Sequence, residues 1–238
     1  MHAAVKNSFI AFNEPIEKRV RHMYLDKKGW VTVGVGNLID PIDDDVLAGK
    51  TALDLPFVYK PGEKNAGKPA NRADIEAEWK LIKGKKELSK EGYKACAKIT
   101  KLELLDPEIN KFVIAKLEEM ENELKLLSAF RDLEQWPADA QLGLLSMSWA
   151  LGTSKLRGGW VNFKAACAKQ NFDTAAKHSH IVDADNPGVI PRNIANLRMF
   201  KNAAAVLAGE GKNAAQNFAQ RTMLHWPHIL MKPITIRG

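Results

Sequence analysis

The sequence predicts an α+β protein that is mainly α-helical, with one small β-hairpin near the N-terminus. Apolar residues recur at spacings of three and four along several long stretches, which is typical of amphipathic helices. An alternating pattern with β-rich residues occurs around positions 23–35. The chain has 238 residues, of which 45% are hydrophobic and 26% charged. This composition excludes a disordered or fibrous protein and allows a sizeable core.

The N-terminal region predicts a helix followed by the hairpin. A short helical pattern runs from Asn7 to about His22 and is interrupted near Pro15. The period then changes to two in the runs 23–26 and 30–35, which flank a turn containing glycine. Two β-rich runs around such a turn predict a hairpin. Alternation in the second run directs its valines to the core and Thr32 to the other face.

The middle of the chain predicts an insertion and then a long helix. Positions 56–72 contain three prolines and two glycines, which favours a loop or an extended insertion. Helical signals resume from Asp74. Asp106 and Pro107 fit an N-cap and a first helical residue. The apolar repeat behind them predicts an amphipathic helix over positions 106–128.

The C-terminal half predicts further helices. Positions 137–152 are apolar almost all round, as expected of a buried central helix that ends at Gly152. Shorter helices are expected at positions 160–170, 173–180 and 193–207. The tail from Trp226 has no assignable pattern.

Net charge, apolar runs and cysteine content narrow the classes of protein to which this chain can belong. The formal net charge of +7 favours an anionic partner, and nucleic acid, anionic lipid and an acidic polymer all qualify. The longest nearly apolar run, Leu142–Leu151, is shorter than the ~20 residues needed to cross a bilayer. No cleavable signal peptide is visible. Cys96 and Cys167 are expected to be buried or half-buried thiols, because two distant cysteines do not form a disulfide framework.

One constellation in the N-terminal region suggests chemistry. Glu17 lies at the end of the first helical pattern, Asp26 beside the hairpin turn and Thr32 on the second strand. Hydrolysis of a glycosidic bond needs a carboxylic acid to protonate the leaving oxygen. It also needs a second group, on the opposite face of the sugar, that stabilises the cation or activates water. The three side chains could converge on one cleft.

The surrounding residues resemble a known family. Positions 17–38 read E-KRVRHM-Y-L-D-KKG-W-V-T-V-G-V-G-N-L. This stretch resembles the Glu…Tyr-x-Asp…Gly-x-x-Thr-x-Gly-x-Gly signature of phage-type (T4 lysozyme-like) lysozymes. A looser similarity covers positions 136–152, 170–176 and 191–207. No motif matches between Ile39 and Glu134.

The resemblance implies a role for each matching residue. Glu17 would be the general acid. Asp26 would stabilise positive charge at the anomeric carbon or help to deliver water, and Thr32 would hold that water. Gly36 and Leu38 would line the cleft beside the sugar.

The resemblance also implies more distant contacts. Trp149 would lie near the floor of the cleft, and Arg192 belongs to the matching closing helix, so both are candidate substrate-binding residues. Asn37 stands where the family usually has histidine, in a role that concerns local stability rather than chemistry. Neither a metal nor another cofactor is implied.

The implied architecture is a single, two-lobed lysozyme-like catalytic domain over residues 1–238. Its small lobe covers about 7–105, including an insertion at 39–105. A bridging helix covers about 106–128 and a helical lobe about 129–238. The domain is expected to be a monomer.

The implied activity is that of an N-acetylmuramidase. It would cleave the β-1,4 bond between N-acetylmuramic acid and N-acetylglucosamine in bacterial peptidoglycan, whose acidic stem peptides suit a charge of +7. The protein would be made in the cytoplasm and act in the periplasm after non-classical export. An endolysin would use a phage holin. A secreted effector would use a secretion-machine component and have a cognate immunity protein. Nucleic acid is not an expected partner. The spacing of the two carboxyl groups decides between inversion and retention.

Two alternatives remain open. A lytic transglycosylase would cleave the same glycan with one acid, but it would not need Asp26 and Thr32. A non-catalytic module that binds cell wall or nucleic acid would account for the charge and for the unmatched residues 39–134. The intact catalytic positions argue against such a module.

Overall fold

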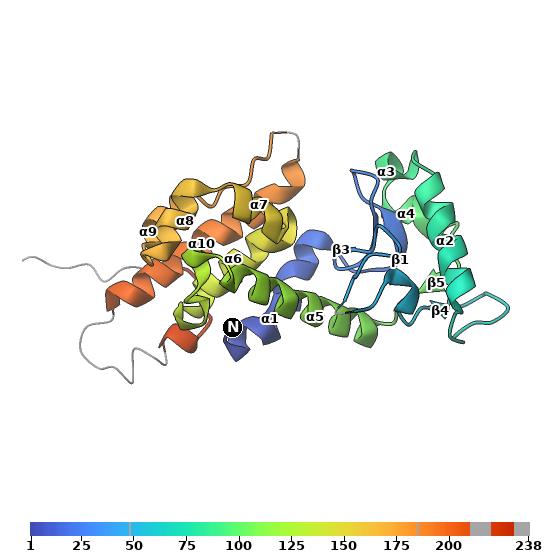
Figure 1. The fold of residues 1–238 in the computed structure, drawn as a ribbon, viewed down its shortest axis with the longest axis horizontal. Helices are drawn as coiled ribbons and strands as arrows, with labels where there is room; N and C mark the ends of the chain where they lie inside the picture. Colours follow the sequence, from blue (N-terminus) through green and yellow to red (C-terminus); the bar gives the residue numbers. More distant parts are fainter. Residues whose placement is uncertain (48, 185, 210–219, 231–238) are drawn as a thin grey trace, which may run out of the picture. The chain divides into compact units, whose positions relative to one another are not determined.

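The computed structural model describes residues 1–47, 49–184, 186–209 and 220–230 (Figure 1). It is 58% helical and 9% strand, which confirms the α+β, mainly α class. The chain divides into two compact units. We call Asn13–Leu117 the sheet unit, and Met1–Phe12 together with Glu118–Gly238 the helical unit. Among the described residues, no helix is long and apolar enough to span a membrane.

The predicted hairpin is present in the sheet unit and continues into a third strand. Strands β1 (Val20–Leu25), β2 (Val31–Gly34) and β3 (Asn37–Leu38) form an antiparallel sheet in the order β1-β2-β3. The predicted second strand over 30–35 is shorter in the structure, because the chain turns back at positions 34–37 to form β3.

The helix predicted from Asn7 to about His22 has different bounds. Helix α1 covers Ala3–Glu17, so it begins and ends earlier. Pro15 lies in its last turn, so the hydrogen bond that its missing N–H cannot make is lost near the helix end, and α1 continues past it to Glu17. Lys18 ends the helix with a left-handed backbone, φ +66°. Strand β1 can therefore start at Val20.

The inserted segment is more regular than predicted. Part of the stretch expected to be a loop or an extended insertion forms β4, which pairs with β5 as a second, two-stranded sheet. Helices α2, α3 and α4 contact β1 in the sheet unit (Figure 1). The elements of this segment are η1 (Ala52–Asp54), β4 (Val58–Tyr59), α2 (Arg72–Gly84), α3 (Leu88–Glu91), α4 (Tyr93–Ala97) and β5 (Leu102–Glu103).

The predicted long helix is α5, Asp106–Lys125, and it passes from the sheet unit into the helical unit at position 117. The Asp106 carboxylate lies in its first turn, where a negative charge favours the helix. Arg21 of β1 forms an ion pair with Asp106, donating from Nε to Oδ1 at 2.9 Å. The start of α5 is therefore joined to the first strand.

The predicted central helix is α6, Ala138–Leu151, in which every residue from Ala138 to Ser148 is buried. It ends at Gly152, whose φ of +80° favours glycine. Helix α10 packs along α6. The other elements of this unit are η2 (Ser128–Phe130), η3 (Leu133–Gln135), α7 (Thr153–Gly158), α8 (Val161–Ala168), α9 (Phe172–Lys177), η4 (Pro187–Val189) and α10 (Ile190–Gly209).

Helices α8, α9 and α10 correspond to the three shorter helices that the sequence predicts, with shifted bounds. Helix α7 was not predicted. Aromatic rings make up much of the core between these helices. Trp136 lies 5.2 Å from Phe172, and Phe163 lies 5.3 Å from Phe200, measured between ring centroids.

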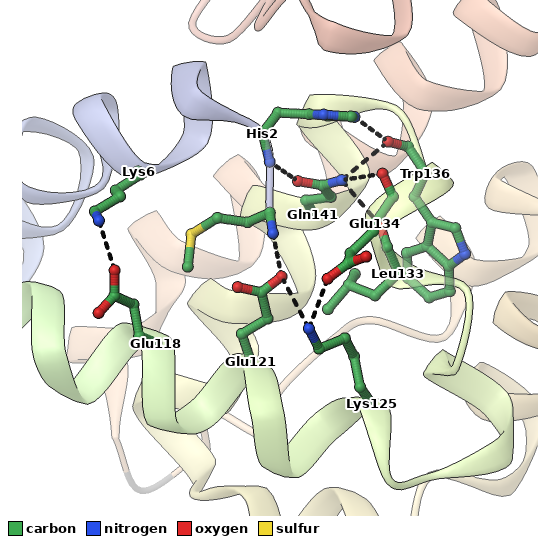
Figure 2. A network of polar contacts seen from close by, with 10 residues as sticks. His2, Lys6, Glu118, Glu121, Lys125, Leu133, Glu134, Trp136 and Gln141 are labelled. Atoms are coloured by element: carbon green, nitrogen blue, oxygen red, sulfur yellow. Dashed lines mark hydrogen bonds and ion pairs between the residues drawn. The ribbon is translucent and has the colours of Figure 1, made fainter. Parts of the chain in front are cut away.

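Polar contacts attach the start of the chain and of α1 to the rest of the helical unit (Figure 2). The amino group of Met1 pairs with Glu121, and the Lys125 ammonium lies 3.9 Å from the same carboxylate. The backbone N–H of His2 donates to Gln141 Oε1 at 2.7 Å. These contacts join residues at the start of the chain to α5 and α6.

A buried carboxylate holds the segment 220–230 in the helical unit. Asp139 is fully buried and accepts hydrogen bonds from the backbone N–H groups of His225 (2.9 Å) and Trp226 (3.0 Å). It also accepts one from Asn202 Nδ2 at 2.9 Å. The unassigned tail beyond position 230 lies outside the described residues.

Candidate active site

The three predicted catalytic residues all belong to the sheet unit. Glu17 is the last residue of α1, Asp26 directly follows β1, and Thr32 lies in β2. The Glu17 and Asp26 side chains are half-buried, whereas Thr32 is 4% exposed. The prediction that Thr32 faces away from the valine core needs a qualification: all four residues of β2 are buried, because both faces of this strand are covered.

One row of residues crosses the three-stranded sheet at Thr32. Tyr24 of β1 lies directly opposite Thr32, and Thr32 lies directly opposite Leu38 of β3. Residues directly opposite each other in an antiparallel sheet carry their side chains on the same face. Tyr24, Thr32 and Leu38 therefore share one face of the sheet.

The Tyr24 phenol reports where the two carboxylates lie. Burial raises its pKa, and the negative charges of Glu17 and Asp26 raise it further, because they disfavour a phenolate. Such interactions weaken with distance. The structure thus brings Glu17 and Asp26 within electrostatic range of a residue that lies opposite Thr32.

The Asp26 carboxylate is oriented by its own turn. Its Oδ1 accepts hydrogen bonds from the backbone N–H groups of Lys28 (2.8 Å) and Trp30 (2.9 Å). Aspartate commonly makes such local contacts in turns. Both bonds fall on Oδ1, and within the described part of the chain Oδ2 accepts no hydrogen bond. That oxygen therefore has its lone pairs available to a ligand.

The Thr32 hydroxyl is also oriented. Its Oγ1 donates to the backbone carbonyl of Trp30 at 3.2 Å. Because the hydroxyl proton is used in this bond, the oxygen lone pairs are left to accept a hydrogen bond from water.

The glycines of the motif are required by the turn between β2 and β3. Gly34 and Gly36 have φ values of +70° and +75°. A Cβ on Gly34 would lie 2.9 Å from Asn37 Oδ1. That oxygen accepts a hydrogen bond from the Val35 N–H at 3.1 Å, whereas the buried Nδ2 has no partner among the described residues. Asn37 therefore has a structural position.

The predicted lining residues Gly36 and Leu38 differ in exposure. Gly36 is half-buried, whereas Leu38 is 49% exposed although it is large and apolar. Leu38 thus offers apolar surface on the face that also carries Thr32.

Trp149 and Arg192 belong to the helical unit. The Trp149 ring in α6 lies 5.1 Å from that of Phe9. The Arg192 guanidinium in α10 is buried, and its Nη1 donates to the carbonyl and hydroxyl oxygens of Ser146 at 3.1 and 3.0 Å. Their proposed contact with substrate stays a prediction.

Sequence reasoning did not assign roles to Tyr24 and Trp30. Tyr24 belongs to the matched motif, so its conspicuous position two residues before Asp26 was a usable signal. Trp30 is an aromatic residue at a turn and is 43% exposed. Its backbone contacts both Asp26 and Thr32, which only the structure reveals.

The two cysteines are free and buried, as predicted. Burial raises the pKa of both thiols, which disfavours the reactive thiolate. In the described part of the chain, no three His, Cys, Asp or Glu residues gather into a group that could hold a metal ion.

No protein-family model, curated protein or solved structure matches this chain significantly. The resemblance to phage-type lysozymes therefore depends on the motif in residues 17–38 and on the arrangement of its side chains.

Proposed function

We propose that this protein is a glycoside hydrolase that cleaves the β-1,4 bond between N-acetylmuramic acid and N-acetylglucosamine in peptidoglycan. One observation carries the proposal. The Trp30 backbone contacts both Asp26 and Thr32, Tyr24 lies directly opposite Thr32, and the charge of Glu17 helps to raise the pKa of Tyr24. An acid, a second carboxylate and a hydroxyl able to hold water are the groups that glycoside hydrolysis requires.

Each group has one task in this reaction. Glu17 donates its proton to the glycosidic oxygen as the bond to the anomeric carbon breaks. Asp26 stabilises the positive charge that develops on that carbon, or orients the attacking water, through Oδ2. Thr32 Oγ1 accepts a hydrogen bond from the water, which adds its oxygen to the anomeric carbon and releases a proton to solvent. Glu17 then regains a proton from solvent, which returns the site to its starting state. No cofactor takes part.

The charge distribution supports an anionic polymer as substrate. Positions 60–101 hold twelve Lys and Arg residues against six Asp and Glu, a net charge of +6 against +7 for the whole chain. A concentrated positive charge raises the encounter rate with an anionic partner such as the acidic stem peptides of peptidoglycan. The inserted segment thus supplies the attraction, and the motif residues supply the chemistry.

The biological setting belongs to the same proposal. Either an endolysin that passes a phage holin or an effector delivered by a secretion machine, with its immunity protein, would bring the enzyme from the cytoplasm to the periplasmic cell wall.

The test compares carboxyl-to-amide variants on purified peptidoglycan and on permeabilised Gram-negative cells. Glu17→Gln and Asp26→Asn are expected to lower the release of reducing ends by about 10²–10⁴-fold, the usual contribution of a general acid or base. Glu91→Gln and Asp43→Asn are matched controls, because both side chains are exposed.

The products decide among the alternatives. New reducing ends found by mass spectrometry support hydrolysis. 1,6-Anhydro ends would instead identify a lytic transglycosylase, and tight binding to the wall without release of fragments would identify a binding module. Full activity of Glu17→Gln would overturn the proposed mechanism.

A further inference from the structure

The backbone of Trp30 is shared by two of the candidate catalytic residues. Its N–H donates to Asp26 Oδ1 at 2.9 Å, and its carbonyl accepts from the Asp26 N–H at 3.0 Å. The same carbonyl accepts from Thr32 Oγ1 at 3.2 Å. A displacement of Trp30 would therefore reorient the Asp26 carboxylate and the Thr32 hydroxyl together.

The Trp30 side chain is held from outside the hairpin. Trp30 is 43% exposed, so core burial alone does not fix its ring. The Lys83 ammonium, from the last turn of α2, lies 4.6 Å from the ring centroid, which is within cation–π range. Lys83 Nζ also donates to the Gly29 carbonyl at 3.0 Å. One side chain of the inserted segment thus contacts two consecutive residues of the turn.

Asp40 completes the connection. Its carboxylate is 3% exposed and pairs with Lys83 Nζ at 2.5 Å. The same oxygen, Oδ2, accepts from the backbone N–H of Val31 at 2.9 Å, at the start of β2. A buried carboxylate is stable only when it is paired and hydrogen-bonded. Lys83 and Asp40 therefore hold the turn at the end where it leads into β2.

A second bond from α2 supports the same region. Trp79 Nε1 donates to the Ile39 carbonyl at 3.0 Å, and the Ile39 N–H donates to the Val31 carbonyl at 2.9 Å. Helix α2 is thus attached both to the residue before Asp40 and, through Lys83, to the turn.

We infer that Lys83 and Asp40 are positioning residues, through which helix α2 of the inserted segment sets the geometry of Asp26 and Thr32. The catalytic consequence rests on the proposed function, whereas the ordering of the turn does not. This assigns a specific task to a segment that no motif explains: it fixes the turn that carries part of the candidate active site.

The first measurement is amide hydrogen exchange by NMR, which needs no activity. Lys83→Met keeps the aliphatic stem and removes the charge. We expect it to speed exchange of the Trp30 and Val31 amides by about tenfold or more, because these amides donate to Asp26 and Asp40 and open more often when the turn is less ordered. Lys80→Met is the matched control, since Lys80 lies on the same helix and its pair with Glu76 is exposed to solvent.

Two further variants separate ordering from folding. Lys83→Met leaves the Asp40 charge buried without its partner, which can destabilise the whole unit. In the double variant Lys83→Met/Asp40→Asn that charge is gone, so the protein is expected to fold while fast exchange at Trp30 and Val31 persists. Lys83→Arg keeps a cation over the ring and is expected to restore slow exchange.

The second measurement is the kinetics on soluble peptidoglycan fragments. Lys83→Met and the double variant are expected to lower kcat about tenfold with KM changed less than about twofold, because a misplaced catalytic group slows chemistry more than binding. Lys83→Arg should recover most of kcat, and Lys80→Met should match wild type.

The outcomes distinguish this inference from the proposed function. If amide exchange at Trp30 and Val31 is unchanged in both Lys83→Met and the double variant, Lys83 and Asp40 do not order the turn, and the inference is overturned. Faster exchange with unchanged kcat overturns the positioning role. A wild-type protein that shows no cleavage, while the exchange pattern is as expected, overturns the proposed function and leaves the ordering of the turn by Lys83 and Asp40 supported.

Discussion

Tyr24 lies directly opposite Thr32 in the β1–β2 ladder, and its phenol is the group on which the charges of Glu17 and Asp26 both act. This relationship links a helix end, a turn and a strand through one residue. It also makes Tyr24 a probe of the site that does not depend on substrate.

The first prediction concerns alkaline pH. The pKa of Tyr24 is raised by burial and by the two carboxylates, whereas an unfolded tyrosine titrates near 10. As the pH rises above 10, the unfolded chain loses a proton that the folded protein retains, so the free energy of unfolding falls. Tyr24→Phe removes this contribution and should lose less stability between pH 9 and pH 11.

Urea unfolding at the two pH values measures this difference. Tyr93→Phe is the control, because its ring packs against Tyr24 at 6.4 Å and the variant leaves the Tyr24 phenol in place. An equal loss of stability in wild type and Tyr24→Phe would show that the raised pKa of Tyr24 does not cause the loss at alkaline pH.

The second prediction concerns acid pH and His22. Burial lowers its pKa below 6.5, and the charge of Lys60 lowers it further, against a hydrogen bond with the Tyr93 carbonyl at 2.8 Å. As the pH falls below about 6.5, the unfolded chain binds a proton before the folded protein does, so stability is lost.

His22→Gln keeps an N–H donor for the Tyr93 carbonyl and removes the titration. Its unfolding midpoint in urea should therefore change less between pH 7.5 and pH 5 than that of wild type. His178→Gln, at an exposed position, should show the same change in urea midpoint between the two pH values as wild type. If the urea midpoint of His22→Gln changed more with pH than that of His178→Gln, this account of His22 would be disproved.

The third prediction concerns the contact between α6 and α10. A Cβ on Gly143 would lie 3.0 Å from Phe200 Cζ, closer than ordinary contact. Gly143→Ala is expected to lower the free energy of unfolding by about 1–3 kcal/mol, because the added methyl group overpacks this contact. The higher helix propensity of alanine offsets up to about 1 kcal/mol of that loss. Gly84→Ala, which meets no atom within 4 Å, should be neutral or stabilising. Chemical denaturation of both variants provides the comparison, and equal stabilities would rule out the close contact.

The fourth prediction concerns Asp139. Asp139→Ala leaves the N–H groups of His225 and Trp226 and the Asn202 amide without their acceptor. Each buried unpaired donor costs about 1–3 kcal/mol, so the free energy of unfolding is expected to fall by several kcal/mol if the segment 220–230 stays in place. If the segment instead detaches, its donors reach water, and limited proteolysis should show faster cleavage within it. Asp132→Ala, at an exposed position, is the control, and equal cleavage of both variants would show that Asp139 does not hold the segment.

The sequence predicted the elements whose signals are local. Helix α5 begins at the predicted Asp106, and α6 ends at the predicted Gly152, because a helix start and a left-handed stop are encoded within a few residues. Strands β3 and β4 have two residues each, which is too short for an alternating pattern to be recognised. The β4–β5 pairing also joins residues more than 40 positions apart.

The candidate site was predictable to a similar extent. Glu17, Asp26 and Thr32 could be singled out because the motif fixes their spacing along the short stretch from the end of α1 to β2. The pair formed by Lys83 and Asp40 has no sequence signal, since a lysine on a helix usually faces solvent and these two residues are 43 positions apart. Such a contact exists only because α2 folds back onto the hairpin.

The division of the chain imposes an order on synthesis. The sheet unit is one continuous stretch that is complete once Leu117 has left the ribosome, whereas residues 1–12 belong with residues made much later. Phe9 is buried beside Trp149, so during translation about 140 further residues must be added before the two rings can pack, which takes on the order of ten seconds at about 5–20 residues per second. Residues 1–12 thus carry apolar side chains, Phe9 among them, whose packing partners are made only after the whole sheet unit has been synthesised.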